Sequence, residues 1–318
     1  MPRRTVVASA LAAVLLVAGC SSSGDQTEPT DAGSTAAAGR AEPPLRYVAL
    51  GDSYTAAPLV PSIDGASGPC VRSTGNYPAL VAEALAAEGR DVRLTDRSCV
   101  EAATADLFAP QTLDGPTLTG EAGPAQTVPA QTAPLDRRTD LVTVGIGGND
   151  VLTPLVGTCP ALRDADPTGS PCAASLGAQP EERLAELRVT LAQALRRVQR
   201  EAPRAQVLLV GYPHTAPATG TCPDRLPLAD GDVAFVRGVA DGLDATMRTA
   251  AQDAGVRFVD AYAASVGHDI CSGDPWVNGA TTDPGAALAF HPFAAGQEAV
   301  ADLVTEAVRP AGRPTGNG

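Results

Sequence analysis

The sequence contains no lysine, so all 23 of its basic residues are arginines, and they form no basic run. The 36 acidic residues outnumber them and give the chain a formal net charge of -13 at pH 7. A protein that binds nucleic acid usually carries a basic patch that neutralises phosphates. The charge pattern therefore argues against nucleic acid as the partner.

Sequence signatures of a zinc site or a phosphate-binding loop are also missing. There are only three histidines, and none of the seven cysteines belongs to a C-x-x-C pair, so a zinc site is not expected. The glycine-rich segment at 145–150, GIGGND, has neither the G-x-x-x-x-G-K-[ST] nor the G-x-G-x-x-G pattern of phosphate-binding loops. We therefore expect neither a metal nor a cofactor.

The apolar run at the N-terminus is too short to span a membrane. It covers residues 6–19, follows Pro2-Arg3-Arg4 and ends at Cys20, as in an export signal. Its last residues, Val17-Ala18-Gly19-Cys20, resemble a bacterial lipobox, in which the cysteine is lipidated and becomes the new N-terminus. An ordinary secretory signal that is cleaved nearby is the alternative.

These observations predict the organisation of the chain. We expect a lipoprotein signal peptide at 1–20, a flexible tether at 21–44, a folded domain at 45–310 and a disordered tail at 311–318. The tether contains no large aliphatic residue, which is typical of segments that do not fold. The predicted product is an exported monomer, anchored by lipid to the outer face of the cytoplasmic membrane or secreted.

An odd number of cysteines in an exported protein needs an explanation. Assigning Cys20 to the lipid leaves six, and we expect these to form three disulfides. Spacing alone does not select their pairing. The six are Cys70, Cys99, Cys159, Cys172, Cys222 and Cys271.

Five short apolar runs predict β-strands, and four helical patterns lie between or after them. The runs are nearly continuous rather than alternating, as expected for strands buried on both faces. The alternation of strands and helices predicts an α/β fold, a three-layer open parallel sheet with helices on both faces. The strands are expected at 46–50, 91–95, 140–146, 205–211 and 256–260, and the helices at 77–88, 180–201, 230–254 and 294–308. Four stretches rich in Gly, Pro and Thr are expected to be loops, at 55–76, 104–136, 157–179 and 212–229.

Three polar residues occupy positions where an acyl-transfer site could form. Ser53 follows the first strand in GDSY, Asn149 follows the third in GGND, and His291-Pro292 precedes the last helix. In an open parallel sheet, ligands bind outside the carboxyl ends of the strands. A serine nucleophile, a histidine base and an amide donor for the oxyanion make up such a site.

Taken alone, Ser53 and Asn149 have a plainer interpretation as turn or capping residues, and His291 has one as an ordinary surface residue. His214, which follows Pro213 after the fourth strand, is a competing candidate for the base. His268 lies close to Cys271 in the sequence, and we interpret it as structural.

In combination, the segments resemble the SGNH, or GDSL-type, hydrolases over residues 46 to 308. The secreted actinobacterial esterase and lipase branch is most similar, through GNYPALVAEAL (75–85), DRSCVEAATADL (96–107) and GHDICSGDPWVNG (267–279). The resemblance implies a flavodoxin-like SGNH fold and hydrolysis of carboxylic esters by Ser53 and His291, without a cofactor. It also implies the disulfide pairs Cys70–Cys99, Cys159–Cys172 and Cys222–Cys271.

The sequence departs from the family pattern at two positions. The resemblance implies an oxyanion hole of Ser53, residue 101 and Asn149, but Glu101 stands where the family usually has glycine. Any residue except proline keeps the backbone N–H, so the donor can survive, although a carboxylate is placed nearby. The second departure is Leu288, where the family usually has the aspartate that orients the histidine.

We expect a main-chain carbonyl to orient His291, giving a Ser–His dyad. Asp283 and Asp260 are alternative partners for His291. Glu101 and Leu288 also leave open a catalytically impaired binding lipoprotein that keeps the fold.

The resemblance implies an acyl-lipid ester or a short-chain ester as substrate. A carbohydrate O-acetylesterase or an acyltransferase of the cell envelope is the alternative enzyme. The segment 104–136 could wall an acyl pocket or be a plain surface excursion. Its large apolar residues are Leu107, Phe108, Leu113 and Leu118.

Overall fold

The computed structural model describes residues 43–113 and 124–308. Cys20 and the signal peptide, all but the end of the predicted tether, Leu118 and the predicted tail at 311–318 lie outside the described residues. The description below concerns only the folded unit.

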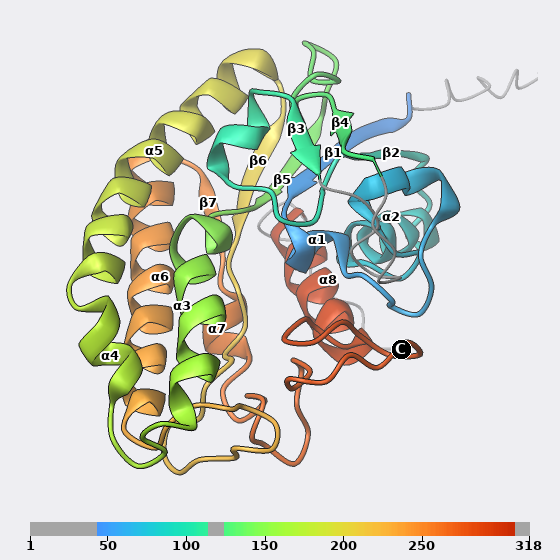
Figure 1. Cartoon of the computed structure of the whole chain (residues 1–318). Helices are drawn as coiled ribbons and strands as arrows, with labels where there is room; N and C mark the ends of the chain where they lie inside the picture. The colour runs from blue at the N-terminus through green and yellow to red at the C-terminus, as the bar shows by residue number, and fades with distance from the viewer. Residues whose placement is uncertain (1–42, 114–123, 309–318) are drawn as a thin grey trace, which may run out of the picture. The chain divides into compact units, whose positions relative to one another are not determined.

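A parallel sheet of five strands forms the centre of the folded unit (Figure 1). Its order is β2-β1-β5-β6-β7, and every neighbouring pair is parallel. This confirms the predicted sheet, with each strand end shifted by one residue. The strands are β1 (Leu45–Gly51), β2 (Val92–Asp96), β5 (Leu141–Gly145), β6 (Gln206–Val210) and β7 (Arg257–Val259).

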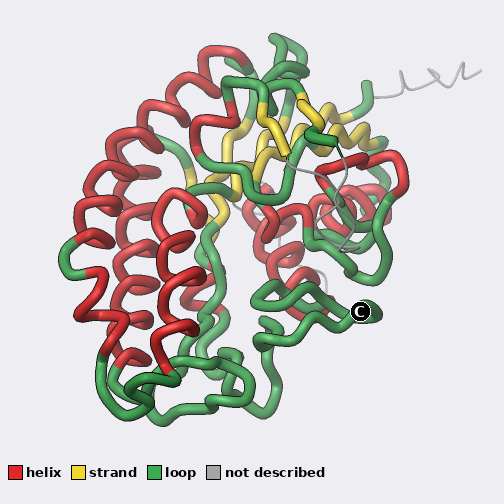
Figure 2. Tube along the Cα trace, viewed as in Figure 1, coloured by secondary structure: helices red, strands yellow, loops and turns green. Residues whose placement is uncertain are grey.

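Helices cover both faces of this sheet (Figures 1 and 2). One layer contains α2 (Tyr77–Ala87) and α8 (Ala294–Val308). The other contains α3 (Gly148–Arg163), α5 (Gln179–Glu201) and α6 (Asp232–Ala254). Shorter elements are α1 (Ser53–Ala56), α4 (Pro171–Leu176), α7 (Ala261–Ala264), the 3₁₀ turns η1 (Gly65–Cys70) and η2 (Thr104–Leu107), and the hairpin of β3 (Gln111–Leu113) and β4 (Gln126–Val128).

The nearly continuous apolar runs are explained by two cores, one on each face. Along β1, Val48 and Leu50 belong to the core under α3, α5 and α6, whereas Tyr47 and Ala49 belong to the core under α2 and α8. Successive strand residues point to opposite faces, so a strand buried on both faces needs apolar residues at every position. The same alternation occurs along β6.

The prediction of a loop over 157–179 was wrong. The structure extends α3 to Arg163 and forms α4 within this stretch. Pro154 inside α3 has no N–H to donate to the Asp150 carbonyl one turn earlier. Arg183 Nη1 donates to that carbonyl instead, at 3.1 Å, and so supplies the missing hydrogen bond from α5.

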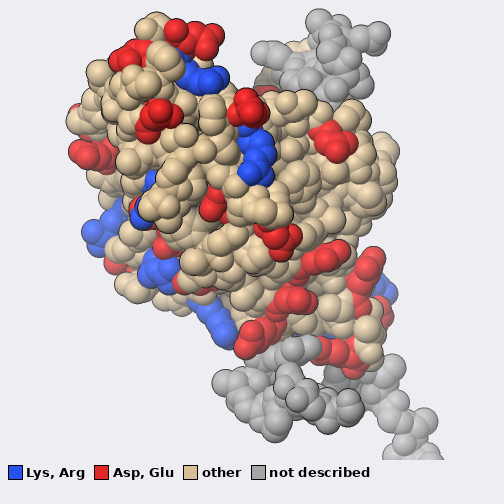
Figure 3. Space-filling view, turned by 90° about the horizontal axis from the view of Figure 1, so that it is seen from below, with Lys and Arg blue, Asp and Glu red and all other residues tan. Residues whose placement is uncertain are grey.

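Three disulfides staple the irregular segments. They are Cys70–Cys99, Cys159–Cys172 and Cys222–Cys271, the same pairs that the family resemblance implies. Disulfides persist in oxidising compartments, which supports export of this chain. Within the described residues, no helix combines the length and apolarity needed to cross a bilayer. On the face seen in Figure 3, acidic side chains are more widespread than arginines.

The strand order places a crevice between β1 and β5. The chain passes from β1 to β2 on one side and then crosses to β5 on the other, so the direction of the winding reverses between these two strands. Ligands of doubly wound sheets bind at the carboxyl ends of strands at such a switch point. The register pairs Gly51 with Gly145, so the two strands end level with each other.

Candidate active site

Ser53 begins the short helix α1 directly after β1. Asp52 caps this helix, and its Oδ1 accepts a hydrogen bond from the Tyr54 N–H at 2.9 Å. Ala57, in the left-handed region with φ 49°, ends it. The first N–H groups of a helix have no intrahelical acceptor, and among the described residues the Ser53 N–H has no partner. Ser53 is only 8% exposed and lines a pocket.

Asn149 lies in the first turn of α3, at the end of β5. Gly147, with φ 120°, makes the sharp turn between the strand and the helix. Asn149 Nδ2 donates to the Ala102 carbonyl at 3.0 Å. An amide nitrogen has two hydrogens, so this bond fixes the side chain and leaves one donor for a ligand.

Glu101 is exposed, and its backbone is in the left-handed region with φ 63°. It follows the disulfide-bonded Cys99 and precedes Ala102, which accepts the hydrogen bond from Asn149. Glu101 lines the same pocket as Ser53 and Asn149. The three residues of the predicted oxyanion hole are therefore neighbours, and residue 101 has the backbone conformation that favours glycine.

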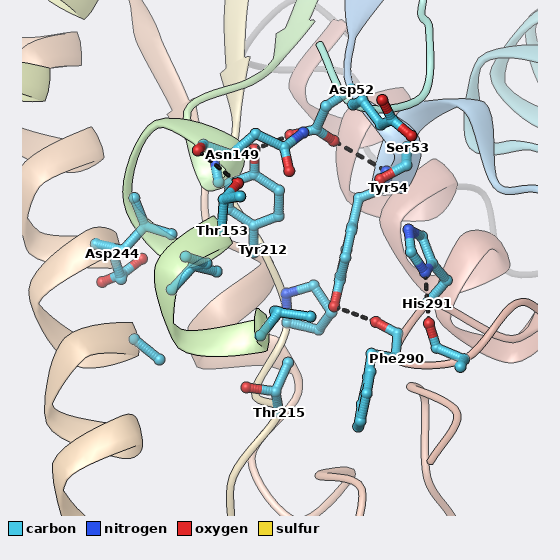
Figure 4. Close-up of a pocket in the computed structure, with 18 of the residues that line it drawn as sticks. Asp52, Ser53, Tyr54, Asn149, Thr153, Tyr212, Thr215, Asp244, Phe290 and His291 are labelled. Atoms are coloured by element: carbon cyan, nitrogen blue, oxygen red, sulfur yellow. Dashed lines mark hydrogen bonds between the residues drawn. The ribbon is translucent and has the colours of Figure 1, made fainter. Parts of the chain in front are cut away.

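A main-chain carbonyl, not a carboxylate, holds the imidazole of His291. Its Nδ1 lies 2.7 Å from the Ala289 carbonyl oxygen. A carbonyl only accepts, so Nδ1 carries the hydrogen and, in the neutral ring, Nε2 has a free lone pair. In Figure 4 this second nitrogen points toward the side on which Ser53 lies. Within the described residues, no hydrogen bond joins the Ser53 hydroxyl to His291.

The two acidic alternatives do not contact His291. Asp260 binds Arg248 at 2.8 Å and caps α7. Asp283 Oδ1 accepts from the Gly285 N–H at 2.9 Å. Both carboxylates are thus engaged in other segments, which leaves Ala289 as the partner that orients the ring.

The segment that carries His291 is anchored from two sides. Asn278 donates its N–H to the His291 carbonyl at 2.9 Å and its Nδ2 to the Ala287 carbonyl at 3.0 Å. The Tyr54 hydroxyl donates to the Phe290 carbonyl at 2.7 Å. Because Tyr54 adjoins Ser53 in α1, this last bond couples the serine and histidine segments directly.

The other two histidines have different surroundings. His214 stacks on Tyr262 with ring centroids 3.6 Å apart, and His268 stacks on Trp276 at 4.6 Å. Neither lines the pocket. In the part of the chain that the structure describes, no group of three or more His, Cys, Asp or Glu side chains could hold a metal ion.

The pocket has a volume of about 640 Å³. Its apolar wall comes from α3 and α6, through Leu152, Val156 and Leu243, and from Phe290 on the histidine segment. Figure 4 shows Ser53 and His291 on one side of this space and Asp244 of α6 on the other. A smaller cavity of about 100 Å³ shares Leu152, Val156 and Phe290 and extends to Leu226 and Ile270.

The described parts of segment 104–136, residues 104–113 and 124–136, do not line the pocket and so do not form the suggested acyl wall. Leu107 and Leu113 are buried in the core. The Phe108 ring lies under the Arg197 guanidinium, 4.0 Å from it. These apolar residues pack against the α5 side of the domain and are therefore not available to a ligand in the pocket.

Asp52 and Tyr212 form a polar pair at the base of the pocket, and Tyr212 was not identified from the sequence. The Tyr212 hydroxyl donates to Asp52 Oδ2 and accepts from the Gly148 N–H at 2.8 Å. Burial raises the pKa of the Asp52 carboxyl to about 7, although the hydrogen bonds from Tyr212 and Tyr54 lower it. The signal in the sequence was the position of Tyr212, directly after the fourth strand.

Comparison with known proteins identifies the family of this chain. Residues 49–299 match the profile of the GDSL-like Lipase/Acylhydrolase family. Lipase 2 of Streptomyces coelicolor is 36% identical over 283 residues, which cover 86% of this chain and 89% of that protein. A lipase of Streptomyces rimosus is 32% identical over 79% of this chain and 82% of its own length.

Two crystal structures have the same fold at 30% sequence identity. The extracellular lipase of Streptomyces rimosus has a TM-score of 0.63, covering 83% of this chain and 100% of the other. Phospholipase A1 of Streptomyces albidoflavus has a TM-score of 0.62, covering 83% and 99%. The profile match spans most of the sequence and includes Ser53, Asn149 and His291. This chain therefore belongs to the GDSL-like lipase/acylhydrolase family and is a carboxylic ester hydrolase.

Proposed function

We propose that Ser53 and His291 act as a nucleophile–base dyad on esters of fatty acyl groups. The observation that carries this proposal is the hydrogen bond between His291 Nδ1 and the Ala289 carbonyl. It fixes the tautomer whose Nε2 can accept a proton, in a ring that lines the same pocket as Ser53. The Ser53–His291 contact is then completed when an ester is bound, since catalytic hydrogen bonds often tighten only in the complex.

The reaction proceeds in two halves. His291 Nε2 removes the Ser53 proton as Oγ attacks the ester carbonyl carbon, and the carbonyl electron pair moves to oxygen. The tetrahedral intermediate collapses, and the alcohol leaves with the proton from His291. Water then attacks the acyl-serine in the same way and releases the carboxylic acid. The Ala289 carbonyl stabilises the imidazolium in each half, less strongly than a carboxylate would.

Three N–H donors surround the position of the oxyanion. They are the backbone groups of Ser53 and Glu101 and the second hydrogen of Asn149 Nδ2. Donors that are fixed before the reaction stabilise the developing charge without reorganisation. Here Ala102 holds Asn149, and the cap of α1 holds Ser53.

The shape of the pocket favours an acyl chain over an acetyl group. The apolar residues Leu152, Val156 and Phe290 lead from the site into the smaller cavity bordered by Leu226 and Ile270. Burying one methylene contributes about 0.8 kcal/mol, which corresponds to roughly fourfold in affinity. An acetyl ester would leave this extension empty, so it is the less favoured substrate.

Hydrolysis of p-nitrophenyl esters by residues 40–318 tests the proposal. We expect kcat/KM to rise from acetate to octanoate, and Ser53→Ala to lower kcat by at least about 10³-fold. Ser53→Ala should remain folded, as judged by circular dichroism. Highest activity on acetate would favour the O-acetylesterase alternative, and an inactive folded parent would favour the binding lipoprotein.

Variants of Glu101 test whether the left-handed backbone at this position of the proposed oxyanion hole destabilises the protein. A non-glycine residue in the left-handed region destabilises the folded state by about 1–2 kcal/mol. Glycine removes this strain but increases the entropy of the unfolded chain, which lowers stability by about 0.4–1 kcal/mol. We therefore expect Glu101→Gly to raise the free energy of unfolding by about 0.5 kcal/mol and to preserve kcat. Glu101→Ala removes the carboxylate but keeps the unfavourable φ. Urea unfolding measures both variants. If Glu101→Gly and Glu101→Ala raised the free energy of unfolding equally, the backbone explanation would be contradicted.

The pH profile tests the assignment of the base. Burial lowers the pKa of His291, and the hydrogen bond to Ala289 partly offsets this. Only the neutral imidazole accepts the serine proton, so kcat/KM should rise as pH increases through this pKa and then level off. The midpoint is expected below the ordinary histidine value of about 6.5. Asp52 titrates nearby, at about 7, so Asp52→Asn serves as the control. A single midpoint above 6.5 that persists in Asp52→Asn would exclude this assignment.

We also propose that Cys20 carries a lipid that anchors the enzyme to the membrane, in accord with the lipobox-like segment before it. In an actinobacterial host, Cys20→Ala should shift the protein from the membrane fraction to the medium or leave it uncleaved, because the thiol that receives the lipid is lost. Cell fractionation followed by immunoblotting measures this. Cys222→Ala, which alters a disulfide cysteine, is the control. Membrane attachment that survives Cys20→Ala would exclude the lipid anchor.

A further inference from the structure

Two of the proposed oxyanion donors, Ser53 and Asn149, belong to different segments that separate beyond the ends of their strands. Ser53 is in α1, which follows β1, and Asn149 is in α3, which follows β5. At the level of the sheet the two segments are joined by the Asp52 N–H, which donates to the Gly145 carbonyl at 2.9 Å. Beyond this point, the distance between Ser53 and Asn149 must be set by other contacts.

Tyr212 supplies such a contact from a third strand end. It follows β6, and its hydroxyl donates to Asp52 Oδ2 and accepts from the Gly148 N–H at 2.8 Å. Asp52 immediately precedes Ser53, and Gly148 immediately precedes Asn149. One hydroxyl group therefore joins the residues next to both proposed oxyanion donors. Figure 4 shows Tyr212 between the segments that carry Asp52 and Asn149.

The fit around this hydroxyl is close. A Cβ at Gly148 would lie 3.1 Å from both Cζ and Oη of Tyr212, tighter than ordinary van der Waals contact. The ring also makes an edge-on contact with Tyr54, with centroids 5.3 Å apart. The Tyr212 ring is thus held on one side by α1 and on the other by the start of α3.

We propose that Tyr212 is a positioning residue of the oxyanion hole. By holding Asp52 and Gly148 at a fixed separation, its hydroxyl sets the distance between the Ser53 N–H and Asn149 Nδ2. Tyr212 does not touch the reacting atoms. The separation that it fixes affects the rate because negative charge develops between the two donors in the transition state. This inference rests on the proposed roles of Ser53 and Asn149.

Tyr212→Phe removes the hydroxyl and keeps the ring. Removal of a whole oxyanion donor costs about 10²–10³ in kcat, and displacement of donors should cost less. We expect kcat for p-nitrophenyl butyrate to fall about 10-fold, with KM within twofold of the parent. A role limited to substrate binding would raise KM instead.

A trifluoromethyl ketone with a butyl chain provides a second readout. Ser53 Oγ adds to its carbonyl carbon, the carbonyl oxygen takes the negative charge, and the serine proton passes to His291. Its inhibition constant therefore reports stabilisation of the oxyanion. We expect Tyr212→Phe to raise this constant by the same factor by which it lowers kcat.

Gly148→Ala disturbs the same contact from the opposite side. It therefore tests the proposal independently, even if Tyr212→Phe fails to fold. Gly148 has no positive φ, and alanine is the better helix former, so the backbone tolerates the change. The added Cβ should displace the Tyr212 ring and produce the same pattern in kcat and in the inhibition constant. Because both changes break one contact, the double variant should be no worse than the poorer single variant.

Tyr47→Phe is the matched control. It removes one hydroxyl that is bound to Thr143 Oγ1 at 2.9 Å, and it lies in the core under α2 and α8, outside the pocket. It should change stability but neither kcat nor the inhibition constant by more than twofold. If Tyr212→Phe and Gly148→Ala behave like Tyr47→Phe in an active parent, the positioning role is refuted. An inactive parent, or activity retained in Ser53→Ala, would refute the proposed function itself.

Discussion

The close approach of β1 and β5 at their carboxyl ends is the constraint on which the site depends. Gly51 and Gly145 face each other there, and Thr55 fills the space beside them. A Cβ at Gly51 would lie 2.2 Å from Thr55 Oγ1 and 2.7 Å from the Gly145 carbonyl oxygen, and a Cβ at Gly145 would lie 2.5 Å from Thr55 Oγ1. Larger residues would therefore force α1 away from β5, and Ser53 away from Asn149.

The second constraint is the acidic surroundings of the site, because the proposed oxyanion would form near two carboxyl groups. Asp52 is buried next to Ser53, and Glu101 lies at the pocket. A carboxylate that oriented His291 would bring a further negative charge to this site, and like charges repel one another. The Ala289 carbonyl orients His291 with a dipole instead of a full charge. The lost stabilisation of imidazolium is thus partly offset by weaker repulsion of the oxyanion.

Much of the fold could be predicted from the sequence, because burial on both faces leaves a continuous apolar run for each strand of the main sheet. The second half of α3 could not, because Pro154 and Pro160 are helix breakers, and only the folded structure shows that Arg183 of α5 satisfies the Asp150 carbonyl that Pro154 leaves free. The proposed site residues Ser53, Asn149 and His291 were selected from motifs after strand ends and before a helix. Ala289 was not, since any residue carries a backbone carbonyl and only the loop conformation selects one. The pocket walls also escaped prediction, because they depend on how α3 and α6 pack across a long sequence separation.

The placement of Asn149 in the first turn of α3 affects how well the site can stabilise negative charge. A helix of 16 residues carries partial positive charge at its N-terminus, which favours an anion there. Asp150 in this turn would cancel that effect if its carboxylate faced the pocket. Instead its Oδ2 accepts from the N–H and the hydroxyl of Thr104, both at 3.0 Å, and it does not line the pocket. The Asp150 carboxylate is therefore turned toward η2, and the positive end of α3 remains available to the proposed oxyanion.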